Sequence, residues 1–323
     1  MTHAAQPGWS VDARVVALGG GHGLAASLAA LRRVVKELTA VVTVADNGGS
    51  SGRLRREFGV LPPGDLRQAL SALCGDDDWG RTWARVLQHR FVSAGEMDNH
   101  AVGNLLIVTL WELLGDHVDG LDWVARLLGA QGRVLPMAVT PMDITASVRG
   151  ADPDHPEAIS TIRGQVEVAS TSGQVTAVHL EPENPPACPE ALAAVAAADW
   201  VVLGPGSWFT SVIPHLLVPE LRSALVRSTA RKVVTLNLEP QAGETDGFSP
   251  ETHLEVLAAH APDLRLDVVL ADRSAVVDEL QLREVAGSLG ARVVVADVAA
   301  DDGSPRHDPV KLAEAYAGFL AEA

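Results

Sequence analysis

A repeated pattern of apolar strand, glycine turn and helix constrains the fold of this chain more than any other feature. Residues 15–18 form a short apolar run, rich in valine, that ends in the glycine-rich segment 19–23. Behind it, apolar residues recur at helical spacing over residues 24–35. A second continuous apolar run, residues 39–45, is typical of a strand buried on both faces of a parallel sheet. The pattern predicts a βαβ unit with a right-handed crossover.

The same pattern returns in the second half of the chain, after two stretches of different character. Residues 64–132 are helical in pattern, whereas residues 134–182 hold short alternating runs divided by Pro, Gly and Asp. We predict one doubly wound α/β domain over residues 1–323, with a mainly helical insertion at about 64–132 and a small β-rich insertion at about 134–182. The later strands are expected at 200–204, 233–237, 266–271 and 291–297, and a terminal helix at 309–323.

The charge balance excludes some classes of partner. With 25 Lys+Arg against 41 Asp+Glu, the formal net charge is −16. This argues against nucleic acid or an anionic bilayer as a general partner, because such binding depends on clustered basic residues. A small anionic ligand is still allowed. Only Lys36, Lys232 and Lys311 are lysines, so arginine, the better bidentate partner of phosphate, carries almost all of the positive charge.

The remaining composition favours a cytoplasmic protein without membrane insertion. The first residues lack a basic segment followed by an apolar run, so no signal peptide is expected. The longest apolar stretch, residues 105–114, is too short to span a bilayer. Cys74 and Cys188 form no metal-binding or disulfide pattern and are interpreted as reduced thiols.

Three polar loops follow predicted strands at their carboxyl ends, the edge where open α/β sheets bind ligands. In the first loop, glycines allow the backbone to approach an anion, and the start of the next helix supplies N–H donors. The third loop is interpreted as another anion nest. The first loop has a simpler interpretation as a tight turn. In the third, Trp208 and Phe209 could stack on a base or pack under the edge of the sheet. The candidate ligand contacts are Gly20, Gly21, His22 and Gly23 in the first loop, and Gly204, Gly206 and Ser207 in the third.

The second loop combines an acid, several small residues and an arginine directly after a buried strand. Asp46 could hold a metal ion or a ribose hydroxyl, and Arg53 supplies positive charge. The Gly-Ser backbone and hydroxyls suit phosphate, although a solvated polar turn explains them equally well. The candidates in this loop are Asp46, Asn47, Gly48, Ser50, Ser51 and Arg53.

Further candidates lie at predicted helix starts. Asn99 is expected to cap the helix that follows it, where His100 and Asn104 share one face and could reach a ligand. His100 could also act as a general base, although no acid at a fixed spacing supports a triad. Asp65 is expected to cap the helix that begins behind the Pro-Pro-Gly segment 62–64.

The last candidates lie near the ends of later strands. Asn237 ends the strand pattern 233–237, and Thr245 lies in the polar loop 241–247, which is expected to be solvated. Arg306 could fold back onto a phosphate, while Asp308 could cap the terminal helix.

Seven of these segments, in this order, resemble the gluconeogenesis factor family called YvcK, which belongs with the 2-phospho-L-lactate transferases to a CofD-like superfamily. The segments are ALGGGHGL, VTVADNGGSSGRLR, LPPGDLRQAL, NHAVGNLLI, LGPGSWFTSVIPHLLVPEL, NLEPQAGETDGF and RHDP. They extend from about Val15 to Asp308. The resemblance implies a Rossmann-like three-layer α/β/α sandwich and a cytoplasmic bacterial protein.

The resemblance also implies a function. Members of the family support growth on gluconeogenic carbon sources, maintain cell shape and wall synthesis, and bind UDP-sugars, without an established reaction. The related transferases pass a lactyl phosphate from a nucleotide carrier to a deazaflavin alcohol with magnesium. Two departures argue against such a transferase here. Asn47 stands where relatives commonly carry a second aspartate, which lowers the expected magnesium affinity, and His22 stands where they usually carry threonine.

We therefore expect a UDP-sugar-binding regulatory protein that links central carbon metabolism to cell-wall synthesis and cell shape without catalytic turnover. Its ligand would be UDP-N-acetylglucosamine or UDP-glucose, and it would require no cofactor. Arg53 or Arg306 would neutralise charge. The expected diphosphate contacts are Gly20, Gly21, Gly23, Gly206 and Ser207. The uridine, ribose or sugar hydroxyls would be recognised by Asp46, Asn47 and Asn237.

The alternative is a magnesium-dependent transferase of a phosphorylated group, in which Asp46 binds the metal ion that bridges the phosphates. A dinucleotide-binding protein is a third hypothesis, which the missing GxGxxG spacing in the first loop disfavours. A homo-oligomer, and protein partners in cell-wall synthesis or its regulation, are compatible with the first hypothesis.

Overall fold

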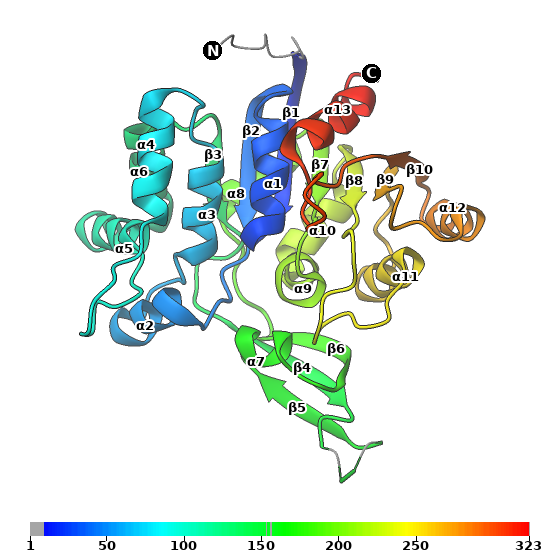
Figure 1. The fold of residues 1–323 in the computed structure, drawn as a ribbon, viewed down its shortest axis with the longest axis horizontal. Coiled ribbons are helices and arrows are strands. Elements are labelled where there is room, and N and C mark those ends of the chain that lie inside the picture. Colours follow the sequence, from blue (N-terminus) through cyan, green and yellow to red (C-terminus); the bar gives the residue numbers. More distant parts are fainter. Residues whose placement is uncertain (1–9, 153, 156, 323) are drawn as a thin grey trace.

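A seven-stranded parallel sheet forms the centre of the molecule (Figure 1). The computed structural model describes residues 10–152, 154–155 and 157–322. The strand order β10-β9-β8-β7-β1-β2-β3 shows that the chain winds outward from β1 in both directions. The winding direction switches between β1 and β7, the position where doubly wound sheets bind ligands. The strands are β1 Val11–Gly19, β2 Val35–Val42, β3 Arg133–Pro136, β7 Trp200–Leu203, β8 Arg231–Thr235, β9 Val268–Asp272 and β10 Arg292–Ala296.

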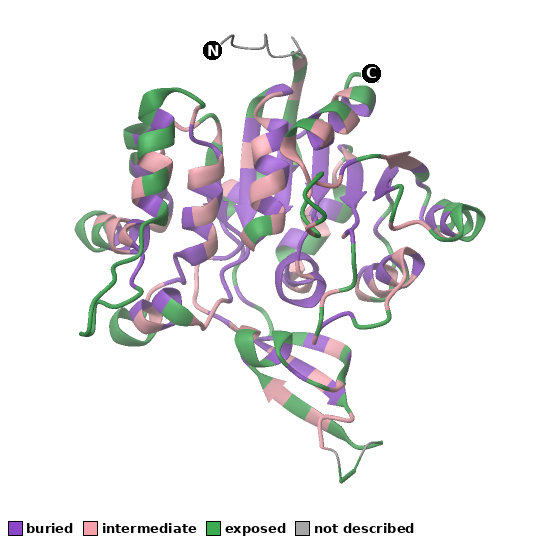
Figure 2. Cartoon of the chain, in the orientation of Figure 1, coloured by how far each residue is buried: buried purple, intermediate pink, exposed green. Residues whose placement is uncertain are grey.

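The apolar runs in the sequence become the buried centre of this sheet, as Figure 2 shows. Residues 15–18 of β1 are at most 3% exposed, because helices cover both faces of the strand. β1 pairs in parallel with β2, with Val16 beside Thr39, and with β7, with Val16 beside Val201. The predicted strands of the central sheet and the α/β fold class are confirmed, whereas residues 165–169 of the predicted β-rich insertion form a short helix.

Helices cover both faces of the sheet and form the two outer layers. α1 (Gly21–Leu31) packs between α3 (Gly64–Ala72) and α13 (Pro309–Leu320) on one face, and α8 (Pro189–Ala197) and α10 (Pro219–Arg227) lie on the other (Figure 1). The remaining helices are α2 Gly49–Phe58, α4 Asp78–Gln88, α5 Val102–Leu114, α6 His117–Leu128, α9 Pro214–Leu217, α11 Pro250–His260 and α12 Glu279–Ser288, with a π-helical turn at Trp208–Val212.

A small antiparallel sheet projects beyond the carboxyl edge of the central sheet (Figure 1). It consists of β5 (Ile159–Arg163), β4 (Asp143–Arg149) and β6 (Gln174–Glu181), in that order, with the short helix α7 (Gln165–Ala169) between β5 and β6. β3 falls within the predicted β-rich insertion but pairs with β2 in the central sheet. The small sheet therefore starts after β3, while the assignment of residues 1–323 to a single domain stays a prediction.

In the part of the chain that the structure describes, each helix is too short or too polar to cross a membrane.

Candidate functional site

Two adjoining cavities open beside the glycine loops at the switch point between β1 and β7. The larger has a volume of about 510 Å³ and extends from the start of α1 to Asn237 and Arg306. The smaller, of about 310 Å³, lies between Asp65, α7 and the π-helical turn. His22, Gly23, Gly206 and Gln241 line both cavities. A ligand with two parts joined by a linker could therefore occupy both at once, with the linker over the glycine loops.

Gly23 and Gly206 allow the first and third loops to approach each other closely. A Cβ atom on Gly23 would lie 2.3 Å from the Pro205 carbonyl oxygen and 2.5 Å from the Gly206 Cα, so a side chain cannot be accommodated there without movement. Gly206 itself has a φ of 139°, which favours glycine. The glycines predicted from the sequence thus bring two backbone segments together at the joint of the two cavities.

Asn237 fixes the third loop in this position. Its side-chain Oδ1 accepts a hydrogen bond from the Gly206 N–H at 2.9 Å, and its Nδ2 donates to the Gly206 carbonyl at 2.9 Å. The amide predicted to recognise a nucleoside or sugar thus has both ends bonded to the backbone, although the residue lines the larger cavity. A direct contact between Asn237 and a ligand stays a prediction.

An internal carboxylate occupies the anion nest that the sequence predicted in the third loop. Ser207 Oγ donates to the Glu244 carboxylate at 2.6 Å, and the N–H groups of Trp208 and Thr210 also donate to it. Burial raises the pKa of Glu244, while these hydrogen bonds oppose the rise. The expectation of a solvated loop at 241–247 is wrong for Glu244, which is 5% exposed.

The neighbouring Thr245 is also directed inward. Its hydroxyl oxygen accepts from the Gln241 N–H at 2.8 Å, and its side chain is fully buried. The sequence signal for the inward contacts of Glu244 and Thr245 is the position of these residues in a loop that follows a buried strand. That position does not distinguish a loop that folds onto the protein from one that faces solvent, so the nest's occupant was missed.

The carboxylate of Asp65 lines the smaller cavity, and the Asp46 carboxylate lies near enough to it for the two charges to interact. Asp46 Oδ1 accepts from the Gly48 N–H at 2.8 Å. Asp65 does not cap α3, whose N-cap is Pro63; instead it lies against Gly20 and Gly21. Burial, and secondarily the charge of Asp46, raise the pKa of Asp65 to about 7, against the opposing effect of the Gly21 N–H.

The donor chemistry of this pair fits a magnesium ion. Mg²⁺ in proteins is commonly held by one or two carboxylates together with the phosphates of a substrate, and Asp46 and Asp65 supply carboxylate oxygens at one edge. Within the described residues, three or more His, Cys, Asp or Glu side chains do not converge on a common metal position. A metal ion here would therefore depend on oxygens from a bound ligand.

Asn47 connects the second loop to the small sheet. Its Nδ2 donates to the Glu167 carboxylate at 2.8 Å, and its Oδ1 accepts from the Val166 N–H at 3.2 Å. An aspartate at this position would face Glu167 with a like charge and lose the donor. The amide that the sequence suggested as a weak metal ligand therefore holds α7 over the smaller cavity.

Ser50, His100 and Asn104 form a buried hydrogen-bonded network between α2 and α5. Ser50 Oγ bonds His100 Nδ1 at 3.1 Å and accepts from the Asn104 side-chain amide at 3.1 Å and from the Ala101 N–H at 3.2 Å. Asn104 Oδ1 in turn accepts from Arg67 Nε at 2.9 Å. These polar atoms are used within the protein, so a ligand contact by any of them stays a prediction.

The surroundings of this network alter two further expectations. Asn99 does not cap α5: its φ is 59°, and the N-cap is Ala101. Burial lowers the pKa of His100, and the nearby Arg53 lowers it further. Arg53 donates to the carbonyls of Glu96 and Asp98, so its charge is directed to the loop before α5. Ser51 is buried beside Gly64.

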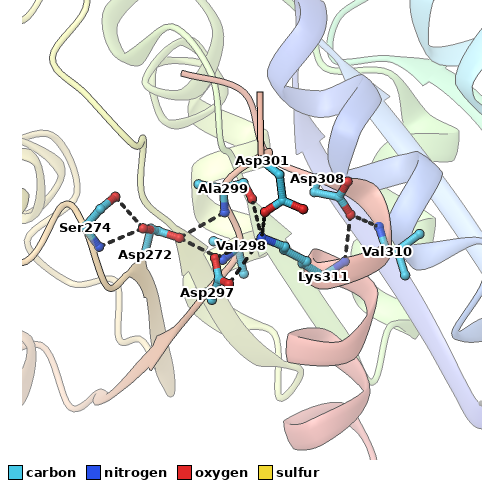
Figure 3. A network of polar contacts seen from close by, with 9 residues as sticks. All are labelled: Asp272, Ser274, Asp297, Val298, Ala299, Asp301, Asp308, Val310 and Lys311. Atoms are coloured by element: carbon cyan, nitrogen blue, oxygen red, sulfur yellow. Dashed lines mark hydrogen bonds and ion pairs between the residues drawn. The ribbon is translucent and has the colours of Figure 1, made fainter. Parts of the chain in front are cut away.

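Arg306 lines the larger cavity from the loop that precedes α13. Figure 3 shows the polar contacts that hold the neighbouring residues of this loop in place. The carboxylate of Asp272, 3% exposed, accepts from the N–H groups of Val298 and Ala299. Lys311 binds Asp297 and Asp301. Asp308 accepts from two N–H groups at the start of α13, which confirms the predicted cap. The guanidinium of Arg306, which pairs with Asp302 at 2.7 Å, is largely exposed.

Comparison with known proteins agrees with this architecture. Residues 15–307 match the family described as 2-phospho-L-lactate transferase CofD. The chain belongs to the CofD family. It is 53% identical over 310 residues to a Mycobacterium tuberculosis protein named "Putative gluconeogenesis factor", covering 95% of this chain and 90% of that protein. It is 35% identical over 318 residues to the "Gluconeogenesis factor" of Listeria monocytogenes, covering 95% of each.

The fold is also similar to a solved structure. A crystal structure of a UPF0052 family member from Bacillus halodurans superposes with a TM-score of 0.83 at 32% identity, covering 94% of this chain and 98% of that one. The family resemblance predicted from the seven ordered segments is confirmed, and so is the three-layer fold that it implied.

Proposed function

We propose that this protein binds a UDP-sugar, such as UDP-N-acetylglucosamine or UDP-glucose, as a regulatory ligand. The observation that carries the proposal is the pair of cavities that meet at Gly23 and Gly206. A UDP-sugar has two bulky parts joined by a diphosphate, and backbone N–H groups at the start of α1 favour an anion at that joint.

A difference between the walls of the two cavities supports a placement for each part of the ligand. The larger cavity has apolar wall residues, Ala26, Leu238, Pro240 and Pro305, and suits the flat uracil ring and its ribose. The smaller has Asp65, Gln165 and Thr210 on its wall and suits the hydroxyls of a sugar. Of the two arginines predicted to neutralise ligand charge, Arg53 and Arg306, it is Arg306 that lines the larger cavity. Arg306 would therefore neutralise the charge of the diphosphate.

The regulatory role extends this binding to physiology. Relatives of this chain are named gluconeogenesis factors, and we propose that UDP-sugar occupancy links central carbon metabolism to cell-wall synthesis and cell shape, without turnover. Protein partners in those processes and a homo-oligomeric, cytoplasmic state are part of the same proposal.

Calorimetric titration of the full chain with UDP-N-acetylglucosamine and UDP-glucose tests the binding. Replacing Arg306 by alanine should weaken binding by roughly 10- to 100-fold, since a hydrogen bond to a charged group contributes roughly 1.5–3 kcal/mol. Arg283→Ala is the matched control, because Arg283 is an exposed arginine paired with Glu279 on α12. No binding of either UDP-sugar at millimolar concentration, with or without magnesium, refutes the proposal.

One observation favours a second candidate function, a magnesium-dependent transferase of a phosphorylated group from a nucleotide carrier. Asp65 lines the smaller cavity and its charge interacts with that of Asp46, and a magnesium ion held by the two carboxylates would offset charge on the phosphates. Asp46→Asn should then abolish turnover. Absence of turnover by the unmodified protein with nucleotide carriers and magnesium argues against this candidate.

A further inference from the structure

In the described part of the chain, β5 has a neighbouring strand on one side only. The order β5-β4-β6 places β5 and β6 at the two edges of the small sheet (Figure 1). β6 packs against α9, whereas the main contacts of β5 are with β4 and α7. The edge of β5 that faces away from β4 is therefore not covered by another strand.

The pairing with β4 shows which main-chain groups lie on this outer edge. The Gly164 N–H donates to the Ile144 carbonyl oxygen on β4 at 2.8 Å. Main-chain groups along an antiparallel strand alternate between its two sides. Those of Ile159, Thr161 and Arg163 therefore point away from β4. Among the described residues outside the sheet, no main-chain group bonds to them.

The sequence of β5 leaves this edge unprotected. Edge strands in native proteins are generally protected from pairing with another chain by charged residues, proline or a bulge. Residues 159–162, Ile-Ser-Thr-Ile, contain neither a charge nor a proline, and three of the four are β-branched, which favours an extended chain. Ile159 is 60% exposed. Such an edge favours pairing with a further strand.

A second copy of β5 matches the outer edge in its hydrogen-bonding groups. When two identical strands pair in antiparallel direction about Thr161, this residue lies opposite the partner's Thr161, and Ile159 lies opposite the partner's Arg163. Each outward N–H then meets an outward carbonyl oxygen. The side chains pair as well, because the apolar stem of the arginine packs on the isoleucine. The arrangement is two-fold symmetric, so it closes as a dimer.

Charge and shape both favour the antiparallel direction. Glu157 is exposed just before one end of β5, and the side chain of Arg163, at the other end, is 57% exposed. Antiparallel pairing brings these opposite charges of the two copies together, whereas parallel pairing would align like charges. Because the small sheet projects beyond the central sheet (Figure 1), antiparallel pairing also directs the two central sheets to opposite ends of the joined sheet.

We propose that β5 pairs with β5 of a second copy of this chain and joins the two small sheets into one continuous sheet. The proposal rests on the homo-oligomeric state that forms part of the proposed function, and gives it a defined interface. One short strand from each copy buries less surface than a standard protein interface, so we expect a weak dimer with a dissociation constant of about 100 µM.

Sedimentation equilibrium of the full chain at about 1 µM to 1 mM tests the pairing, with Thr161→Pro as the variant. Proline removes the outward N–H at the two-fold axis but no hydrogen bond to β4, because that N–H points away from β4. The dissociation constant should rise at least about tenfold. Thr161→Val is the matched control, since it retains the N–H and the β-branched shape and should dimerise like the unmodified chain.

The outcomes separate this interface from the rest of the proposed function. A dimer that Thr161→Pro leaves unchanged overturns the interface but not the homo-oligomeric state. A chain that stays monomeric up to about 1 mM contradicts both. Circular dichroism shows whether the variant retains its fold, and titration with UDP-N-acetylglucosamine tests ligand binding independently of either result.

Hydrogen exchange at two protein concentrations locates the contact. The Thr161 amide should exchange quickly in the dilute monomer and be protected in the concentrated dimer. The Ile162 amide, which faces β4, is the internal control and should be protected at both concentrations. Rapid exchange of Thr161 in a sample that sedimentation shows to be dimeric contradicts the proposal.

Discussion

The glycine-loop region around β1 and β7 and the α2–α5 region contain the same kinds of residues but use them differently. In the first region, His22, Gly23 and Arg306 border open cavities. In the second, Ser50, His100 and Asn104 bond to one another, and Arg53 bonds to backbone carbonyls. Both regions have motifs typical of ligand binding. The difference shows that such a motif alone does not decide whether its polar residues border a cavity or are buried in a network within the protein.

Of the variants considered, the largest loss of stability is expected on removal of the Ser50 hydroxyl, which lies at the centre of the network between α2 and α5. Ser50→Ala leaves the Ala101 N–H and the Asn104 amide without their acceptor, so the free energy of unfolding should fall by about 3 kcal/mol. The affinity for UDP-N-acetylglucosamine should change by less than about threefold. Chemical denaturation and calorimetry measure the two quantities.

The control for this variant is Ser93→Ala, which removes an exposed hydroxyl in the loop before α5 and should leave stability nearly unchanged. If Ser50→Ala instead abolishes binding while stability is retained, the division between the two regions is wrong, and the second loop contacts the ligand.

A side chain at the joint of the two cavities should weaken binding strongly. The Cβ of Gly23→Ala would force the first and third loops apart, so we expect at least about 100-fold lower affinity for the UDP-sugar, or about 2.8 kcal/mol. Gly287→Ala on α12 is the control, since a Cβ there meets open space. If Gly23→Ala left the affinity unaltered, the diphosphate would not bind at the joint of the two cavities.

Two histidines extend the comparison to pH. His22 is exposed at the cavities, whereas His215 is fully buried, with Nε2 3.0 Å from the Val41 carbonyl oxygen. Burial lowers the pKa of His215 to about 4. Because the folded pKa lies below the ordinary value near 6.5, the unfolded chain binds a proton first as the pH falls. The contribution of His215 to stability is thus complete above about pH 6.5 and is lost toward pH 4.

His215→Gln should therefore reduce the loss of stability between about pH 7 and pH 4.5 by roughly 2.5 kcal/mol. Thermal unfolding followed across this pH range measures the difference, with His22→Gln as the exposed control. An unchanged pH dependence in His215→Gln would mean that the imidazole has the same pKa in the folded and the unfolded protein.

Much of the fold could be predicted because it depends on local patterns. Continuous apolar runs become strands when both faces are covered, and the glycine turn after β1 follows from the need of the backbone to turn sharply into α1. β3 coincides with the first alternating run of the predicted β-rich insertion, but the sequence did not assign this strand to the central sheet. Its place in the central sheet depends on pairing with β2, which is distant in the sequence.

The sequence by itself determined which loops lie at the carboxyl edge of the sheet, because strand and helix order decide where each strand ends. Only the tertiary structure decided which polar groups in those loops remain free. Glu244 fills the nest at Ser207, and Asn237 binds Gly206, although each pair is more than thirty residues apart. Whether a donor or acceptor is satisfied depends on such distant partners, and burial makes the pairing obligatory. The local sequence pattern around a residue therefore does not reveal whether its donor or acceptor has such a partner.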